Sequence, residues 1–197
     1  MKYYQELSLL PGYDVPLLFV WSKVYQQIHL GFVEQQDDSG NVPYGVSFPQ
    51  YQHDKKKPVL GEKVRIFARS EEELLKLGLK KWLERLVDYV HITGIREVPE
   101  KKIGFAIYRR VRQENSADSK ARRFLARHAE KEMGLEQAVV MFSMTTRRFC
   151  EFPFVKQKSL TNNNLFRLYI EKKSCKDEVY DGFGTYGLSN TSTVPEF

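Results

Sequence analysis

Residues 16–29 read PLLFVWSKVYQQIH, and this stretch predicts the helix around which the first half of the chain is organised. Apolar side chains recur in it every three or four residues, which gathers them on one side of an α-helix. These side chains belong to Leu17, Val20, Trp21, Val24 and Ile28. Before the helix, residues 3–9 alternate weakly as a strand does and end at the turn signal of Pro11 and Gly12.

After this helix the pattern predicts two short strands, at 44–48 and 62–68. Ser70 followed by Glu73 is a capping box, which begins a second helix with a clear apolar stripe. A fourth strand is predicted at 89–97. The order strand, helix, strand, strand, helix, strand is that of a ferredoxin-like unit, whose four-stranded sheet is also the scaffold of many RNA-recognition modules.

The sequence as a whole predicts an α+β protein of two domains. A ferredoxin-like, RRM-like domain is expected at 1–97, and a smaller C-terminal α/β domain with an arginine-rich helix at 98–197. The elements predicted in the second domain are a strand at 103–108, a helix at 117–131 and strands at 154–158 and 165–170.

The formal charge of +6 lies wholly in the second of these domains, because residues 98–197 hold 18 of the 31 Lys and Arg but only 12 of the 25 Asp and Glu. Within it, residues 109–127 contain six arginines and one lysine against two acids. On the predicted helix, one stripe of cations lies beside an apolar seam: Lys120, Arg123, Arg127 and Lys131. Clustered guanidinium groups bind phosphates bidentately and release counterions, so a polyanionic partner is expected.

Several other classes of protein are disfavoured. The N-terminus lacks the layout of a signal peptide, and the longest apolar run, Val15–Trp21, contains Pro16 and is too short to span a bilayer. Cys150 and Cys175 form neither a disulfide framework nor a zinc spacing, which favours reduced thiols in a cytosolic protein. With no Walker loop and no metal-ligand spacing, we expect no metal and no cofactor.

Four histidines are the candidates for acid–base chemistry: His29, His53, His91 and His128. For any one of them alone, a surface or structural role is the more common one. If the chain cleaves nucleic acid, a metal-free cut in RNA is favoured. A neutral imidazole takes the proton of a ribose 2′-OH, which attacks the adjacent phosphate and yields a 2′,3′-cyclic phosphate and a 5′-OH.

Short motifs along nearly the whole chain then resemble one known family. They are GVSFP at 45–49, LGE at 60–62, the arginine-rich strand and helix, PFV at 153–155, FRL at 166–168, YGLS at 186–189 and VP at 194–195. In this order they are similar to the CRISPR-associated endoribonuclease of the type I-F (Csy) system, which cuts precursor CRISPR RNA beside each repeat hairpin. The resemblance implies a ferredoxin-like first domain, an enzyme without cofactor that stays on its RNA product, other subunits of a surveillance complex as partners, and the cytoplasm of a prokaryote.

The resemblance also implies roles for single residues. His29 matches the catalytic histidine, Ser159 the serine that holds the ribose 2′-OH, and Tyr186 the tyrosine that orients the histidine. Phe166 matches an aromatic residue that stacks on the base of the stem, and Arg110 an arginine that reads a guanine edge. The arginine-rich helix would lie in the major groove of the hairpin. The further residues expected on RNA are Arg112, Lys120, Arg122, Arg123, Arg127 and Thr161.

The sequence departs from the family pattern at four places. Tyr25 is a second candidate for the histidine position, because the loop after the first helix is longer here. Ala126 replaces one arginine of the groove helix, Arg112 replaces a glutamine that would read adenine, and Thr161 replaces the second serine of a Ser-x-Ser. Two alternative functions remain open: a non-catalytic RNA-hairpin-binding module, and a binder of double-stranded DNA.

Overall fold

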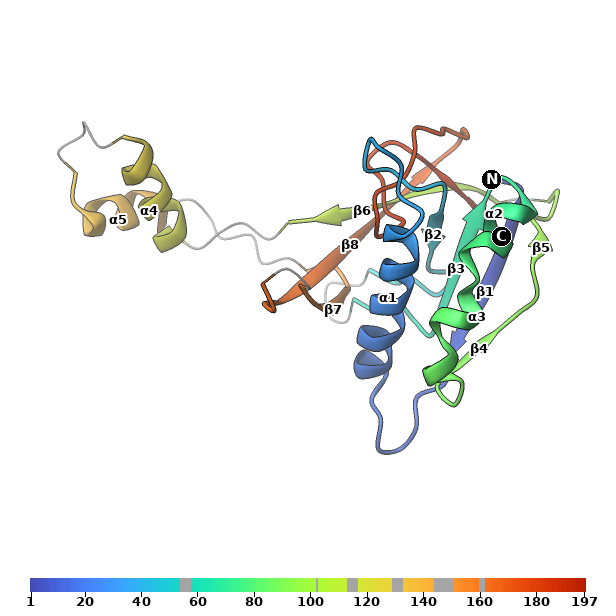
Figure 1. Cartoon of the computed structure of the whole chain (residues 1–197). Coiled ribbons are helices and arrows are strands. Elements are labelled where there is room, and N and C mark those ends of the chain that lie inside the picture. Colours follow the sequence, from blue (N-terminus) through green and yellow to red (C-terminus); the bar gives the residue numbers. More distant parts are fainter. Residues whose placement is uncertain (54–57, 102, 113–116, 129–132, 144–150, 160–161) are drawn as a thin grey trace. The chain divides into compact units, whose positions relative to one another are not determined.

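The computed structural model describes residues 1–197 except 54–57, 102, 113–116, 129–132, 144–150 and 160–161. The chain forms two compact units (Figure 1). The larger comprises Met1–Val111 and Glu151–Phe197, and the smaller comprises Arg112–Cys150. The domain boundary predicted after residue 97 falls between the two sheets of the larger unit and stays a prediction.

The first sheet of the larger unit has the ferredoxin-like arrangement that the sequence predicts. Its strands are β1 (Tyr3–Leu9), β2 (Gly45–Ser47), β3 (Lys63–Ala68), β4 (Val90–Ile92) and β5 (Arg96–Glu97). They are antiparallel in the order β2-β3-β1-β4, and β5 also pairs with β1. The single strand expected at 89–97 is divided at Thr93. Its backbone N–H still donates to the Glu6 carbonyl (3.0 Å), but the Glu6 backbone N–H donates to the Thr93 hydroxyl (3.0 Å) in the place of a strand carbonyl.

The helices of this unit are α1 (Leu17–Val33), α2 (Glu71–Leu77), α3 (Leu79–Trp82) and a 3-10 turn at Glu84–Leu86. Helix α1 buries the apolar stripe predicted for it, and the capping box of Ser70 and Glu73 is present at α2. The second helix was expected to be continuous. It breaks at Gly78, whose left-handed backbone (φ 60°) ends α2 and begins α3.

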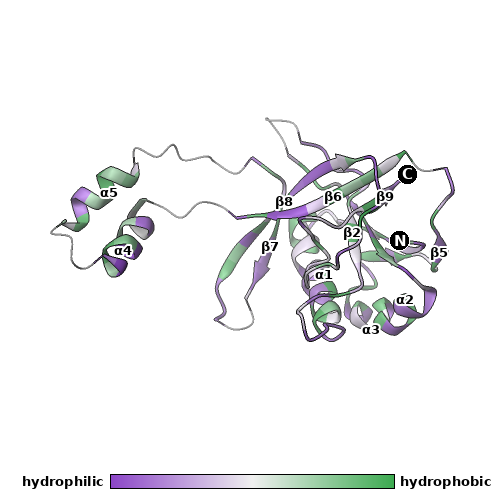
Figure 2. Ribbon diagram, turned by 90° about the horizontal axis from the view of Figure 1, so that it is seen from above, coloured by the Kyte–Doolittle hydropathy of each residue, from purple (hydrophilic) through white to green (hydrophobic). Residues whose placement is uncertain are grey.

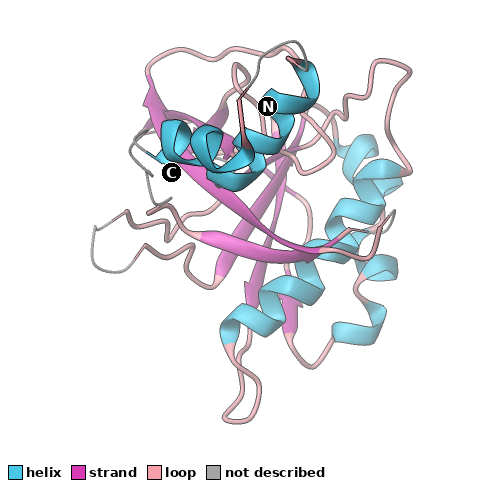
Figure 3. Cartoon of the chain, turned by 90° about the vertical axis from the view of Figure 1, so that its left-hand side faces the viewer, coloured by secondary structure: helices cyan, strands magenta, loops and turns pink. Residues whose placement is uncertain are grey.

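The second sheet also belongs to the larger unit, whose strands are drawn in magenta in Figure 3. The strands of the second sheet are β6 (Gly104–Val111), β7 (Phe154–Lys158), β8 (Leu165–Cys175) and β9 (Val194–Glu196), in the order β7-β8-β6-β9. Strand β8 continues five residues beyond its predicted end at 170, because β6 pairs with it as far as Cys175. Helix α1 packs against β7, and one apolar core contains residues of both sheets, for example Val64 and Leu168.

The smaller unit consists of α4 (Ala117–Arg127) and α5 (Leu135–Ser143). Both helices carry hydrophilic and hydrophobic residues (Figure 2). They pack through Ala121 and Ala138, which are fully buried, and through an edge-to-face contact of Phe124 with Phe142 at 5.7 Å between ring centroids. Helix α4 begins where the sequence predicts, whereas α5 was not predicted.

None of the helices in the described ranges is long and apolar enough to cross a membrane. The α+β class is confirmed, with a ferredoxin-like first sheet and further α and β elements after it.

Candidate active site

A pocket of about 510 Å³ in the larger unit collects residues from both ends of the chain. The contributing segments are helix α1, strand β6, the β7–β8 hairpin and the loop before β9. The lining residues are Gln26, His29, Arg110, Lys158, Ser159, Asn162, Asn164, Phe166 and Tyr186. Five residues for which the sequence predicts a role in RNA binding or cleavage therefore share one pocket.

His29 lies near the end of α1, at the edge of its buried face. Its Nδ1–H donates to the backbone carbonyl of Thr185 (2.8 Å), since a carbonyl can only accept. Burial lowers the pKa of His29, although the bond to Thr185 acts in the opposite direction. The neutral ring with a proton on Nδ1 has a free lone pair on Nε2, which is the form that a general base requires.

The ring of Tyr186 stacks on the imidazole of His29, with 4.0 Å between the ring centroids and 11° between the planes. Burial raises the pKa of the Tyr186 phenol, and the nearby Arg110 guanidinium opposes this change. The phenol therefore stays protonated at neutral pH. A flat, uncharged partner restricts the tilt of the imidazole without competing for its lone pair.

The backbone of Tyr186 is itself held in place by the core. The hydroxyl of Tyr25 donates to the Tyr186 carbonyl (2.9 Å), and Tyr25 is fully buried on the inner face of α1. Gly187 has φ 67°, and a Cβ there would come within 2.6 Å of Val46. Tyr25, the second candidate for the histidine position, therefore supports the pocket from the core and does not line it.

Ser159 directly follows β7 and begins the loop to β8. Its backbone N–H donates to the carbonyl of Asn164 (2.9 Å), which closes the loop, and Asn163 takes the left-handed conformation (φ 57°). Asn164 in turn donates its backbone N–H to the side chain of Asn162 (3.1 Å). Thr161, expected on RNA, lies outside the described residues.

Arg110 and Phe166 meet on the same side of the second sheet. The guanidinium carbon of Arg110 lies 5.3 Å from the Phe166 ring centroid and 5.8 Å from that of Tyr186. The pairing of β6 with β8 sets this geometry, because it places Arg110 opposite Ile170, on the same face as Phe166. A planar cation between two rings suits a phosphate and a base edge.

The remaining predicted RNA contacts belong to the smaller unit. Helix α4 exposes Arg122, Arg123 and Arg127, and Lys120 on the same helix is half-buried. Arg112 is exposed and begins this unit. Three residues of the basic stripe predicted from helical spacing, Lys120, Arg123 and Arg127, lie on this helix, which ends at Arg127, whereas the fourth, Lys131, lies outside the described residues.

Four lining residues were not predicted: Gln26, Lys158, Asn162 and Asn164. The first lies one helical turn before His29, and the second directly precedes Ser159. The only sign in the sequence that these four residues line the pocket was that each lies close in the chain to a residue predicted for the site.

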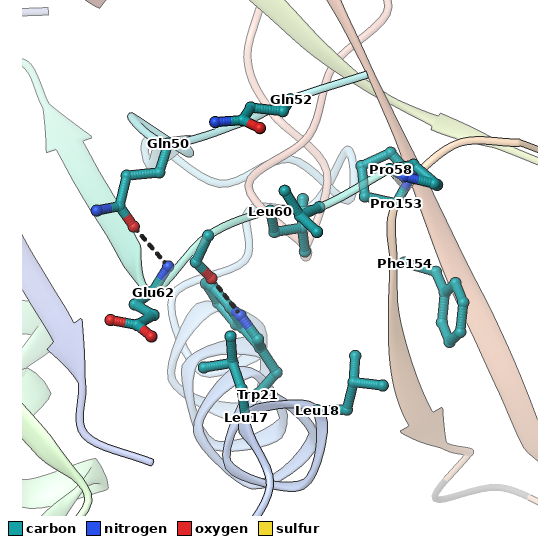
Figure 4. A pocket seen from close by; sticks show the side chains of 12 residues that line it. Leu17, Leu18, Trp21, Gln50, Gln52, Pro58, Leu60, Glu62, Pro153 and Phe154 are labelled. Atoms are coloured by element: carbon teal, nitrogen blue, oxygen red, sulfur yellow. Dashed lines mark hydrogen bonds between the residues drawn. The ribbon is translucent and has the colours of Figure 1, made fainter. Parts of the chain in front are cut away.

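A second cavity, of about 650 Å³, has a different character (Figure 4). It is lined mainly by apolar side chains such as Leu17, Trp21 and Leu60. Its hydrogen bonds are internal: Trp21 donates to the Gly61 carbonyl (2.8 Å), and the Glu62 backbone N–H donates to the Gln50 side chain (2.7 Å). No histidine lines it, so the smaller pocket, which His29 lines, is the candidate for acid–base chemistry. Within the described ranges no three His, Cys, Asp or Glu side chains group as metal ligands.

A ferredoxin-like sheet and a half-buried histidine in a polar pocket of a basic protein agree with an RNA-directed family, and comparison with known proteins identifies it. The family described as CRISPR-associated protein (Cas_Csy4) matches residues 4–197, and the chain belongs to this family. The family resemblance found in the sequence is thereby confirmed.

Two relatives match over the full length of both chains. The "CRISPR-associated endonuclease Cas6/Csy4" of Pseudomonas aeruginosa (strain UCBPP-PA14) is 30% identical over 198 residues. The protein of the same name from Escherichia coli (strain UTI89 / UPEC) is 29% identical over 201 residues. Among solved structures, a "CRISPR associated protein Cas6" superposes with a TM-score of 0.32 at 14% identity, covering 99% of this chain and 98% of that one, which is too distant to support an argument.

Proposed function

We propose that this protein is an endoribonuclease that cuts precursor CRISPR RNA at the base of the repeat hairpin, without a metal ion, and stays bound to the hairpin. The endonuclease names of both relatives support the reaction class. The observation that carries the mechanism is the fixed orientation of His29, between the Thr185 carbonyl and the ring of Tyr186.

In the proposed reaction, Nε2 of His29 takes the proton of the ribose 2′-OH, while the hydroxyl of Ser159 holds that group in line with the phosphorus. The 2′-oxygen bonds to phosphorus, the bond from phosphorus to the 5′-oxygen breaks, and the leaving oxygen takes up a proton. The products carry a 2′,3′-cyclic phosphate and a 5′-OH. General base help of this kind contributes about two to four orders of magnitude in rate.

The positive groups of the pocket have a second role in this reaction. Arg110 and Lys158 line it without any acidic neighbour in the lining, and they would stabilise the added negative charge on the phosphorane. Phe166 would stack on the last base pair of the stem, and Arg110 would also read a guanine edge.

Binding of the RNA hairpin is assigned to Lys120, Arg122, Arg123 and Arg127 of the basic helix α4, to Arg112 before that helix, and to Thr161 in the chain between β7 and β8. If α4 binds the stem of the RNA hairpin and the pocket cuts beside that stem, the contacts to the stem survive the cut. The enzyme would then remain on its product. The proposal has three further parts. The enzyme keeps its product, its partners are other subunits of a type I-F complex, and it acts in the cytoplasm of a prokaryote.

The test uses the repeat RNA of the CRISPR array that accompanies the gene. Replacing the 2′-OH at the cut by hydrogen should abolish cleavage and leave binding nearly intact, because the nucleophile is removed while the stem is unchanged. Cleavage of the normal RNA should proceed in EDTA and give a cyclic phosphate. Cutting of the deoxy RNA, or a strict magnesium requirement, would rule out the mechanism. Tight binding with no cut in either RNA would support the non-catalytic alternative.

A further inference from the structure

The outer face of the β7–β8 hairpin carries a row of cations. Side chains alternate along both strands, so Val155, Gln157 and Leu168 point inward and are buried. The other face, called here the cationic strand face, is formed by Phe154, Lys156 and Lys158 of β7 and by Leu165, Arg167 and Tyr169 of β8.

The charges on the cationic strand face disfavour folding. Lys156 lies directly opposite Arg167 in the strand register, and like charges at such positions are destabilising. Among the described residues, no carboxylate pairs with Lys156, Lys158 or Arg167. The carboxylate of Glu171, further along β8, is bound by Arg109 (2.6 Å). The face therefore keeps its positive charge available to an anionic ligand.

Aromatic rings lie among these cations. The guanidinium carbon of Arg167 lies 4.8 Å from the ring centroid of Phe154, and Arg167 donates to the Tyr169 hydroxyl (3.4 Å). Phe154 and Tyr169 contact each other at 5.4 Å between centroids. Tyr169 is buried, so the partly exposed Phe154 is the ring of this pair that a base can reach. Cations beside an accessible aromatic ring are typical of surfaces that bind single-stranded nucleic acid, through the backbone charge and the faces of the bases.

The cationic strand face continues from the candidate active site. Lys158 lines the pocket and directly precedes Ser159. Lys156 lies two residues back along β7, or about 7 Å away at the rise of a strand. This separation is close to that of neighbouring phosphates in an extended single strand. An RNA strand leaving the pocket could therefore place successive phosphates on Lys158 and then on Lys156 or Arg167.

We propose that the cationic strand face binds the single-stranded RNA that flanks the repeat hairpin. This inference rests on the proposed function, and it adds a second RNA site to it. The flank on either side of the stem offers the same phosphate and base chemistry.

The experiment compares three RNAs, each blocked by a 2′-deoxy group at the cut: the minimal hairpin, and the hairpin extended by about eight uridines on its 5′ or its 3′ side. In the unchanged protein, at least one extension should tighten binding. The log Kd of that extended RNA should also rise more steeply with the logarithm of the salt concentration than the log Kd of the minimal hairpin does. The slope should increase by about 0.7 for each phosphate bound, or about 1.4 for two. The double variant K156Q/R167Q should lose both differences. The matched variant K76Q/K80Q, which removes two exposed charges from α2 and α3, should keep them.

The outcomes separate the two proposals. If neither extension tightens binding, or if the gain persists in K156Q/R167Q, the cationic strand face is not an RNA site, while binding and cleavage of the minimal hairpin still support the proposed function. If the minimal hairpin is neither bound nor cut when its 2′-OH is present, both proposals fall. A gain from the 5′ or the 3′ extension alone identifies which flank is held.

Discussion

In the proposed reaction His29 must be uncharged to accept a proton, and its surroundings favour that form. Burial lowers its pKa from the usual 6.5, so the neutral ring persists into mildly acidic solution. The folded protein then binds fewer protons at this site than the unfolded chain does. The stability that this site contributes is accordingly full above pH 6.5 and declines as the pH falls from there toward the lowered pKa.

We predict that kcat/KM for hairpin cleavage rises with pH through an inflection below 6.5 and is level above it, because only neutral His29 acts as a base. His29→Ala should slow single-turnover cleavage by about two to four orders of magnitude and leave hairpin affinity unchanged. His91→Ala, at an exposed position of β4, is the control and should cleave normally. Full activity of His29→Ala would assign the base to another group.

Tyr25 offers a test of how much the support of Tyr186 matters. We predict that Tyr25→Phe lowers kcat with little change in KM, because the Tyr186 carbonyl loses its partner and the ring beneath the imidazole is less well fixed. Tyr44→Phe is a matched control, since the buried Tyr44 hydroxyl also donates to a backbone carbonyl at 2.9 Å, that of Glu73 on α2. Both variants should lose about 1 kcal/mol of stability in urea unfolding. An equal effect of the two on kcat would deny Tyr25 a positioning role.

At the scale of elements, the turn at Gly187 couples the last loop to the first sheet. Its N–H donates to the Gly184 carbonyl (2.7 Å), and its carbonyl accepts from the Val46 N–H (3.0 Å). The left-handed backbone and the nearness of Val46 both exclude a side chain. The turn therefore brings Thr185 and Tyr186 against α1.

We predict that Gly187→Ala destabilises the protein by more than Gly78→Ala and also impairs cleavage. Both glycines have positive φ, which costs an alanine about 1–2 kcal/mol. At Gly78 the nearest atom to an added Cβ is 3.8 Å away, whereas at Gly187 it is 2.6 Å away, so only the second change forces a displacement. Thermal unfolding and single-turnover cleavage measure the two effects. If Gly187→Ala and Gly78→Ala lost equal stability, the side chain of Val46 would move away from the added methyl group at no cost.

The helices and strands also show which features of the fold can be predicted from the sequence. Helix α1 and the capped start of α2 were predictable because periodicity and capping are local. The break at Thr93 was not, because it depends on a hydrogen bond to Glu6 across the sheet. The roles of Ser159 and Tyr186 came from family resemblance alone. Their approach to His29 depends on long-range pairing, which no local pattern encodes.

At the scale of the whole molecule, the two sheets of the larger unit share one apolar core. Residues of β3 and of β8 belong to the same cluster, and the Tyr108 hydroxyl on β6 reaches the Phe48 carbonyl (3.4 Å) and Glu196 (3.0 Å). The ferredoxin-like fold therefore does not stand apart from the second sheet. Its stability should depend on residues from both.

We predict that Leu168→Ala, in the second sheet, costs about 2–5 kcal/mol and unfolds the first sheet at the same urea concentration. Hydrogen exchange should show the amides of β3 and of β8 losing protection together. Leu165→Ala on the same strand is the control, because Leu165 is 81% exposed and its loss should have little effect. Separate transitions for the two sheets would indicate two folding units.

The stacking of His29 on Tyr186 also has a consequence during protein synthesis. The two rings belong to residues far apart in the sequence, so the histidine is synthesised well before the ring on which it stacks. A chain that stopped between them would carry the histidine without that ring. If the proposed function holds, such a truncated chain should cleave hairpin RNA more slowly than the full chain.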